Sequence, residues 1–266
     1  MLHVEAWKTN TKVQDSWQHE VLGPMAATLS YFNGRGHGER VRYALAAAGI
    51  PFSETLLTKR GDMDSVRPKC LFGQVPLLEI GGVPAIQSWA TVRHIAAISG
   101  MVPKDAALAW RADAVAEQVR DLFVAGNLVS FGWGEREADA AKVAAAAAAH
   151  LPKFEAILGE GAPFVCGAEA NWADFQLLYG LNYVRYGAAC HRAKLRAQQL
   201  THNPRFLQIE EVLPGSLGAY PRLAKLRDAL NTLPRMAAFL AGQAKPLVNE
   251  QYIYEVRTAQ LPSEAP

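Results

Sequence analysis

The sequence predicts an α/β domain with a split, four-stranded mixed sheet, followed by a domain made only of helices. Up to Gly100 the predicted elements follow the order β-α-β and then β-β-α, which is typical of such a sheet. Past Pro103 no convincing strand occurs, and Ala, Leu, Arg and Glu dominate long runs of helical period. We therefore expect an N-terminal extension at residues 1–25, the α/β domain at 26–102, the helical domain at 103–245 and a tail at 246–266.

The first predicted strand spans residues 27–32 and ends in Tyr31 and Phe32. The loop that follows, residues 33–38, reads NGRGHG, and its glycines let the backbone approach a ligand closely. The glycine spacing does not fit a dinucleotide fingerprint, and no acidic ribose partner stands at the expected distance. The loop is therefore not a Rossmann nucleotide site.

The next three segments complete the β-α-β unit and lead out of it. Residues 39–48 form the first predicted helix because apolar residues recur at helical spacing, and Gly49 followed by Pro51 ends it. Residues 52–57 are predicted to be the second strand. Residues 58–72 form a polar connector that we expect to be irregular.

Residues 72–96 carry the most informative pattern of the chain. Residues 75–80 have the composition of a strand, but Pro76 cannot donate to a ladder and so belongs at an edge or at a cis bond. Val75 would then have backbone groups available to a ligand. Gly81 and Gly82 stand between two apolar runs and predict a tight hairpin turn.

The second hairpin strand, residues 83–86, runs directly into Gln87 and Ser88. Ser88 is a suitable N-cap for the apolar-periodic helix that follows, and the N–H groups of its first turn form an anion site. On the pattern alone, a hairpin packed on a helix, with the polar pair only capping and turning it, is the favoured interpretation.

In the helical domain we predict helices at residues 104–130 and 137–158. Asn171 and Asp174 form a capping-box variant at the start of a further helix. Two closing helices begin near Tyr220 and Leu233. The segment before them, residues 188–217, has no assigned role.

Composition excludes several classes of function. The chain has 266 residues, 50% of them apolar and 20% charged, and its formal charge of +2 comes from scattered side chains. No nucleic acid or membrane partner is implied. Cys70, Cys166 and Cys190 lack the spacing of a disulfide framework or a metal site. Neither a spanning segment nor a secretory signal is recognised, so we expect a cytoplasmic protein.

Three motifs together resemble the cytosolic glutathione S-transferases. The signature YFNGRGHGERVRYALAAAG, which begins at Tyr31, resembles the tyrosine-type alpha, mu, pi and sigma classes, and GQVPLLE followed by QS is shared by most classes. The Asn171-Trp-Ala-Asp174 cap resembles the folding signal of the same family. The resemblance implies a thioredoxin-like βαβ-ββα domain, an all-α C-terminal domain and a homodimeric detoxification transferase. Glutathione would be a co-substrate, with no cofactor and no metal.

The resemblance assigns roles to residues of the first domain. It implies that Tyr31 donates its hydroxyl to the glutathione sulfur, and that Val75, before the cis-proline Pro76, pairs its backbone with the cysteinyl unit. Gln87 and Ser88 would hold the γ-glutamyl carboxylate.

Further glutathione contacts are implied outside that core. Arg67 would bind the glycyl carboxylate, with Gln74 in the same binding site, and Asp113 would reach the γ-glutamyl amino group of a partner subunit. His37 stands where an arginine is usual in the family. Electrostatic stabilisation of the thiolate by this residue would therefore be weaker or pH-dependent, because a histidine is charged only at lower pH. Met63 replaces a frequent tryptophan, which leaves the glycyl subsite incomplete.

The second substrate would be a small hydrophobic electrophile. Its pocket is expected between Tyr31, Phe32 and the inner face of the 104–130 helix, where three side chains are candidates for the lining: Phe123, Asn127 and Phe131. Ordinary helix packing explains those three equally well.

Three functions remain open from the sequence. The first is glutathione conjugation, with glutathione peroxidase or isomerase activity as variants of the same thiolate chemistry. The second is a non-catalytic ligand-binding or structural member of the family, which the tail and the departures at His37 and Met63 favour. The third, a thiol-disulfide oxidoreductase, needs a cysteine near the first helix, and none stands between Tyr31 and Glu39.

Overall fold

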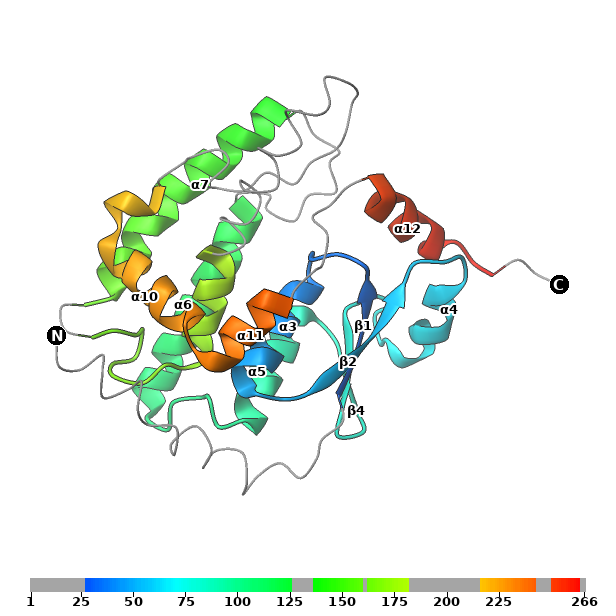
Figure 1. The fold of residues 1–266 in the computed structure, drawn as a ribbon, viewed down its shortest axis with the longest axis horizontal. Coiled ribbons are helices and arrows are strands. Elements are labelled where there is room, and N and C mark those ends of the chain that lie inside the picture. The colour runs from blue at the N-terminus through cyan, green and yellow to red at the C-terminus, as the bar shows by residue number, and fades with distance from the viewer. Residues whose placement is uncertain (1–26, 126–135, 160–161, 182–215, 243–249, 264–266) are drawn as a thin grey trace.

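A computed structural model describes five parts of the chain: residues 27–125, 136–159, 162–181, 216–242 and 250–263. The predicted extension at residues 1–25 lies outside these parts, as do residues 188–215 of the segment that the sequence left unassigned. Figure 1 shows a small sheet with helices on both of its sides, next to a group of longer helices.

The sheet has four strands in the order β2-β1-β3-β4. Strand β1 (Ala27–Phe32) pairs in parallel with β2 (Phe52–Leu57) and antiparallel with β3 (Leu77–Ile80), which pairs antiparallel with β4 (Val83–Ala85). The mixed sheet and the β-α-β, β-β-α order are confirmed. Both strands of the first unit have the predicted bounds.

Backbone constraints written in the sequence determine the second half of the sheet. Gly81 and Gly82 adopt φ of 55° and 78°, the positive values that a primed hairpin turn requires. The Val75–Pro76 peptide is cis, as predicted. Strand β3 begins only at Leu77, later than the predicted start at residue 75, because Pro76 has no N–H for the ladder.

Helices α3 (Gly38–Ala48) and α5 (Ser88–Ile98) pack together on the side of the sheet that faces the helical domain. The sequence suggested an irregular connector at residues 58–72, and this prediction was wrong. The connector contains α4 (Asp62–Val66) and the 3-10 turn η1 (Arg67–Lys69). Asp62 organises its start by accepting the N–H groups of Thr58 and Lys59, both at 2.7 Å.

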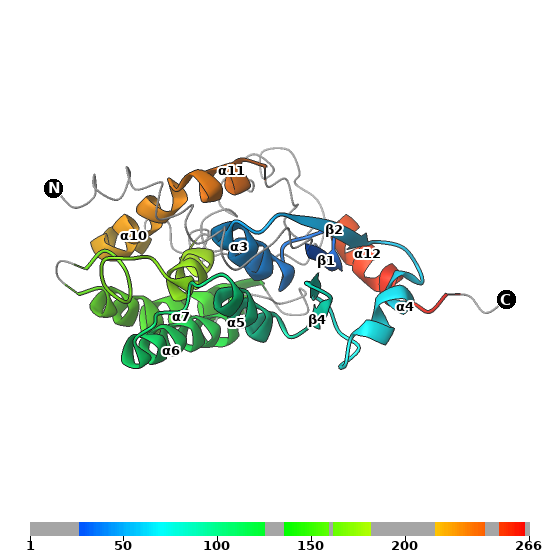
Figure 2. The ribbon, with the colours of Figure 1, turned by 90° about the horizontal axis from the view of Figure 1, so that it is seen from below.

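Most described residues of the predicted tail form helix α12 (Glu250–Gln260), which packs against α4, β1 and β2. It buries Val256 and Ala259, one helical turn apart. In Figure 2 it lies beside α4, on the side of the sheet away from the helical domain. The tail thus extends the core of the α/β domain.

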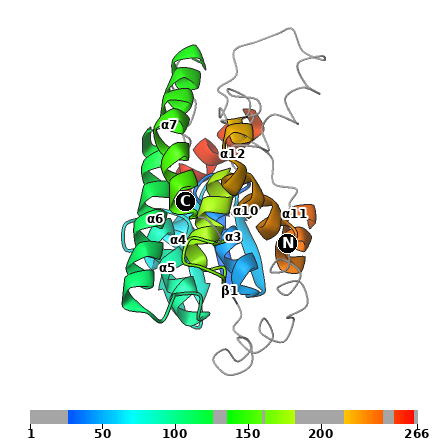
Figure 3. The same ribbon diagram turned by 90° about the vertical axis from the view of Figure 1, so that its left-hand side faces the viewer.

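The second domain consists of helices in its described residues, apart from turns and an isolated bridge between Phe164 and Gly167. Its elements are α6 (Ala106–Ala125), α7 (Arg136–Ile157), a helix at 172–181, the 3-10 turn η2 (Ser216–Ala219), α10 (Pro221–Asn231) and α11 (Pro234–Gly242). Figure 3 shows α6 and α7 running side by side. Helix α6 starts two residues later than predicted, and the predicted helical residues beyond 125 lie outside the description. No helix in the described ranges has both the length and the apolarity to cross a membrane.

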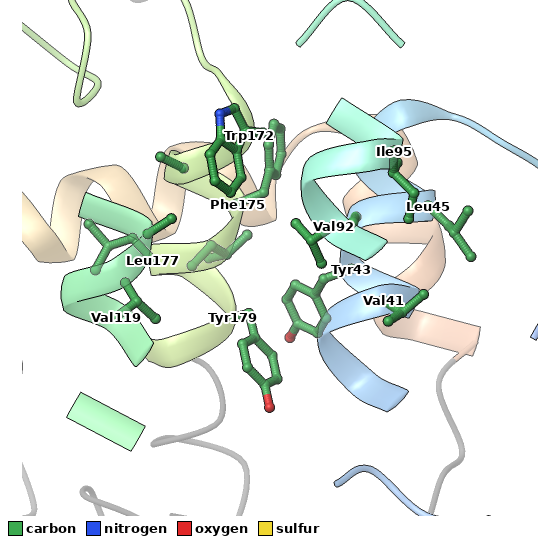
Figure 4. Packing of buried hydrophobic residues seen from close by; sticks show 14 of the residues in the cluster. Val41, Tyr43, Leu45, Val92, Ile95, Val119, Trp172, Phe175, Leu177 and Tyr179 are labelled. Atoms are coloured by element: carbon green, nitrogen blue, oxygen red, sulfur yellow. The ribbon is translucent and has the colours of Figure 1, made fainter. Parts of the chain in front are cut away.

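The two domains share one hydrophobic core. Tyr43 of α3 packs edge-on against Tyr179 at 5.5 Å between ring centroids, and Val92 and Val119 lie in the same cluster (Figure 4). The 172–181 helix therefore joins the α/β domain to the bundle.

A predicted capping box starts the 172–181 helix. Asn171 accepts the Ala173 N–H at 2.9 Å through its side chain, and the buried Asp174 carboxylate accepts the Asn171 N–H at 2.8 Å. The Val165 N–H also donates to Asp174, at 2.8 Å. The capping prediction is confirmed, and the box additionally fixes the preceding loop.

Candidate active site

Several predicted site residues meet at one end of the sheet. Ser30 pairs with Leu77, and Leu78 pairs with Ala85. Because these pairs are antiparallel, the end of β1 at Tyr31 and Phe32, the residues before β3 and the residues after β4 lie at the same end of the sheet. The hairpin thus brings the neighbourhoods of Tyr31, Pro76 and Gln87 to one end of the sheet.

Tyr31 is wrapped by the glycine-rich loop that follows it. Its side chain is 2% exposed, and its hydroxyl oxygen accepts the His37 backbone N–H at 2.9 Å. A Cβ at Gly36 or at Gly38 would lie less than 3.0 Å from the tyrosine side chain, and Gly36 also has φ of 40°. Only glycine permits so close an approach. A hydroxyl that accepts one hydrogen bond can still donate its own hydrogen.

A buried ion-pair group holds this loop in place. Arg42 of α3 donates to Glu54 at 2.6 Å, to Glu39 at 3.0 Å and to the Gly34 carbonyl oxygen at 2.9 Å. The side chains of Arg42 and Glu39 are 1% and 3% exposed. Because buried charges need partners on every side, this group links β2, α3 and the loop rigidly.

The histidine at position 37 is partly enclosed by the fold. Its side chain is half-buried, and its Nδ1 atom is out of contact with water. Burial, together with the positive charge of Arg40, lowers the pKa of His37 to about 4. The imidazole is therefore neutral at physiological pH and provides no charge to the site.

Sequence reasoning did not identify Arg40. Its guanidinium is fully buried, 3.7 Å from the ring centroid of Trp89 on α5, and it also faces Phe123 and Tyr179 at 5.2 and 5.5 Å. The Tyr179 hydroxyl donates to the Gly36 carbonyl oxygen at 3.4 Å. The sequence did contain a pattern that could have drawn attention to Arg40. Three charged residues, Glu39, Arg40 and Arg42, stand within one turn of a short helix.

Gln87 and Ser88 stand at the start of α5, but not as predicted. The N-cap is Gln87, with φ of 63°, and no side-chain cap hydrogen bond is formed, so Ser88 is the first helical residue. Ser88 is buried and Gln87 is exposed. Positive φ is costly for a residue with a Cβ, and such strain is concentrated at ligand sites. The first-turn amides and the helix dipole favour an anion here.

The residues expected at the glycyl subsite lie on the connector. Arg67 donates to Asp64 at 3.0 Å and to the Gln260 carbonyl oxygen of α12 at 3.3 Å. Gln74 is exposed, Val75 is half-buried, and Met63 is buried in the core. Arg67 therefore has contacts with the tail that the sequence did not reveal.

Asp113 lies on α6 and is half exposed. It accepts the Arg93 Nε–H at 2.6 Å, and Arg93 also pairs with Glu117. Arg111, two residues before Asp113, instead donates to the Val165 carbonyl oxygen at 2.7 Å. The partner comes from α5, 20 residues away in the chain.

The aromatic residues expected near the electrophile divide into two groups. Phe32 is buried next to Tyr31, with ring centroids 5.3 Å apart. Phe123 stacks on Tyr179 at 4.9 Å, with an interplanar angle of 3°. Asn127 and Phe131 lie outside the described residues.

Burial determines the state of the described cysteines. It raises the pKa values of Cys70 and Cys166, so both are protonated thiols at neutral pH. Cys190 lies outside the described residues. Within the described parts, no group of three or more His, Cys, Asp or Glu side chains could hold a metal ion.

Comparison with known proteins shows the family to which the chain belongs. The family model for the glutathione S-transferase N-terminal domain matches residues 27–97, and the one for the C-terminal domain matches residues 126–243. The chain is 32% identical to glutathione S-transferase alpha-3 of Rattus norvegicus and 30% identical to glutathione S-transferase A4 of Mus musculus. Each alignment spans 237 residues and covers 86% of this chain and 96% of the relative.

A solved structure agrees in fold. The crystal structure of the glutathione S-transferase from Ascaris lumbricoides has a TM-score of 0.63 and 26% identity to this chain. The superposition covers 84% of this chain and 98% of the other. The α/β domain is thus the thioredoxin-like domain expected above, followed by the helical domain. The chain belongs to the glutathione S-transferase family and is a glutathione transferase.

Proposed function

We propose that Tyr31 activates glutathione in this transferase by donating its hydroxyl hydrogen to the sulfur. The observation that carries the proposal is the wrapped position of Tyr31 at the end of β1, at the end of the sheet where β3 begins and β4 ends. A free thiol has a pKa of about 8.5, and one unit of lowering needs about 1.4 kcal/mol of preference for the thiolate. A charge-assisted hydrogen bond of about 1.5–3 kcal/mol supplies one or two units.

Glutathione would lie across the end of the sheet. The Val75 backbone would pair with its cysteinyl unit, and Gln87 with Ser88 would hold the γ-glutamyl carboxylate at the start of α5. The positive φ of Gln87 and the dipole of α5 support this assignment. Arg67 and Gln74 would bind the glycyl end, for which Arg67 must exchange the Gln260 carbonyl for the ligand carboxylate.

The second substrate would be a small hydrophobic electrophile near Tyr31 and Phe32. The apolar, aromatic character of the neighbouring core, which includes Phe123, supports this class. The same thiolate would also serve glutathione peroxidase or isomerase chemistry.

The active form would be a cytoplasmic homodimer. Leu71 and Phe72 are 81% and 60% exposed, directly before the residues that would bind glutathione. Large apolar side chains exposed together favour an interface between subunits. Asp113 would then reach the γ-glutamyl amino group in the partner's site.

The test combines glutathione affinity chromatography with turnover of glutathione and a chlorinated nitrobenzene. We expect retention on the matrix and conjugate formation, both lost when free glutathione analogues compete. Retention without turnover of this or other electrophiles would contradict the catalytic role of Tyr31 and favour a ligand-binding role instead.

A further inference from the structure

The last described residues of the chain lie along the connector that carries Arg67. Residues 260–263, which we call the C-terminal strap, are the end of α12 and the three residues after it. Helix α12 anchors the strap, because its buried Val256 and Ala259 belong to the core of the α/β domain, beside α4 (Figure 2). The strap therefore lies away from the helical domain, which would line the electrophile pocket.

Two carbonyl oxygens of the strap accept hydrogen bonds from the connector. The Gly61 N–H donates to Leu261 at 3.1 Å, and the Arg67 guanidinium donates to Gln260 at 3.3 Å. Gly61 has φ of 80°, and a Cβ at this position would lie 3.2 Å from Ser263, so a side chain would disturb the contact. The guanidinium that would bind the glycyl carboxylate is thus already engaged by the strap.

Asp64 joins the strap and Arg67 through its two carboxylate oxygens. Its Oδ2 accepts the backbone N–H and the hydroxyl of Ser263, at 2.8 and 3.0 Å, and its Oδ1 accepts Arg67 at 3.0 Å. The two hydrogen bonds from Ser263 lower the pKa of Asp64, so the carboxylate is ionised at neutral pH. Asp64 therefore holds Arg67 and the strap in one group of hydrogen bonds.

A ligand carboxylate needs the same nitrogens of Arg67. Nη1 donates to Asp64 and Nη2 donates to the Gln260 carbonyl oxygen. A guanidinium binds a carboxylate most strongly through two parallel N–H groups. If the two terminal nitrogens are to bind a carboxylate in this way, the strap carbonyl must leave Nη2. A neutral ligand group gains less from the guanidinium and has less reason to displace the strap.

We propose that the C-terminal strap competes with the glycyl carboxylate of glutathione for Arg67, and that this competition sets how strongly the transferase prefers glutathione over tripeptide thiols with a neutral glycyl end. The inference rests on the proposed function and deepens it. Release of the strap takes up part of the binding free energy of glutathione, whereas a ligand that leaves the strap in place avoids this cost. The strap therefore narrows the difference in affinity between the two kinds of ligand.

The test compares glutathione with glutathione amide, in which the glycyl carboxylate is a neutral carboxamide of the same shape. Ser263→Pro removes both donors to Asp64 and leaves Arg67 unchanged. In calorimetric titration this variant should bind glutathione about threefold to tenfold more tightly than the wild type, the factor for one hydrogen bond of ordinary net strength. Its affinity for glutathione amide should stay the same.

Two further variants are the controls. Ser263→Ala removes only the hydroxyl and should give an intermediate gain for glutathione. Thr232→Ala removes an exposed hydroxyl that donates to the Ala229 carbonyl oxygen in the helical domain, and it should match the wild type with both ligands. Unchanged glutathione affinity in Ser263→Pro, or an equal gain for both ligands, would overturn the inference.

A second measurement uses the unaltered chain and does not depend on a variant folding. Coupling between two binding events is reciprocal, so glutathione must weaken the strap as the strap weakens glutathione binding. Hydrogen exchange at the Gly61 N–H should therefore become faster on saturation with glutathione and stay unchanged with glutathione amide. Unchanged exchange with glutathione would also overturn the inference. A wild type that binds neither ligand would instead reject the proposed function.

Discussion

The His37 backbone N–H donates to the Tyr31 hydroxyl oxygen at 2.9 Å, which fixes the phenol at the end of β1. The contact is available because Gly36 and Gly38 let the loop close over the ring. The hydroxyl is thus oriented before any substrate binds, and preorganised donors contribute most where negative charge develops.

Replacing Tyr31 by phenylalanine should lower kcat by roughly ten- to a thousandfold, the range for loss of one preorganised donor. Glutathione affinity should change little, because the donor acts on the charge at sulfur. Ultraviolet titration of bound glutathione should show a raised thiolate midpoint. Tyr220→Phe, which removes a hydroxyl from the helical domain, is the matched control. An unaltered midpoint in Tyr31→Phe would remove this residue from the chemistry.

Replacing Gln87 and Ser88 together by alanine should raise KM more than it lowers kcat. These residues would hold a remote carboxylate, which contributes equally to ground-state and transition-state binding. Calorimetric titration with glutathione measures the effect. Ser99→Ala, at the other end of α5, removes a hydroxyl that donates to the Ile95 carbonyl oxygen at 2.7 Å and serves as the control. Unchanged affinity in the double variant would limit the pair to a structural role.

Replacing Arg42 by methionine should lower the free energy of unfolding by about 3–5 kcal/mol, because it leaves the buried Glu39 carboxylate without its partner. Urea denaturation of the folded variants gives the value. Arg67→Met breaks an exposed pair with Asp64 and should lower the free energy of unfolding far less, because solvent screens that pair. Losses of equal size in the two variants would contradict a dependence on burial.

The pH dependence of stability should contain two opposing contributions. The folded chain keeps His37 neutral down to about pH 4, whereas the unfolded chain protonates it near 6.5. The unfolded state binds more protons in that window, so this contribution falls as the pH is lowered from 6.5 to 4. Burial raises the pKa of Asp174 from 3.8 to about 7, so the folded state binds more protons and its contribution falls as the pH rises through that range.

Two variants separate these contributions in urea titrations at several pH values. The free energy of unfolding of His37→Gln should rise relative to that of the wild type as the pH falls from 6.5 to 4. The free energy of unfolding of Asp174→Asn should rise relative to that of the wild type as the pH rises from 4 to 7. Each pKa unit corresponds to about 1.4 kcal/mol at most. If the stability of a variant and of the wild type changed in parallel with pH, the replaced residue would have the same pKa in the folded and the unfolded chain.

Asp113 should contribute to glutathione binding in the partner's site. Light scattering should give a mass near two chains, and Asp113→Ala should weaken glutathione binding while the Arg93–Glu117 pair remains. A two-fold dimer makes the contact reciprocal. A mass near one chain would contradict the shared site.

A mixed dimer distinguishes sharing from a local effect. When a Tyr31→Phe chain pairs with an Asp113→Ala chain, both lesions fall in one site if Asp113 crosses the interface, and the other site stays intact. Activity should then exceed the average of the two parental homodimers. Activity equal to that average would locate the effect of Asp113 within its own chain.

The sequence was sufficient where short-range geometry decides the structure. Proline without an N–H before β3, two glycines at a turn, and the Asn171–Asp174 cap each restrict only their own neighbourhood, so their predictions were confirmed. The sequence did not predict the start of α5 correctly, because the N-cap position depends on the backbone conformation in which the hairpin leaves Gln87. It was also insufficient in the connector, where Asp62 organises a short helix that composition did not indicate.

By itself the sequence determined the order of elements and the first two strands, because periodicity and backbone sterics act within a few residues. The same sterics limited Pro76 to a sheet edge or a cis bond, and the candidate tyrosine came from the resemblance to the family. Only the tertiary structure decided that Arg40 is enclosed by aromatic rings, that His37 is neutral, that Asp113 pairs with Arg93, and that α12 covers the sheet beside α4. Each of these depends on burial and on side chains from distant segments. Desolvation and ion pairing are properties of the packed chain, and no local pattern encodes them.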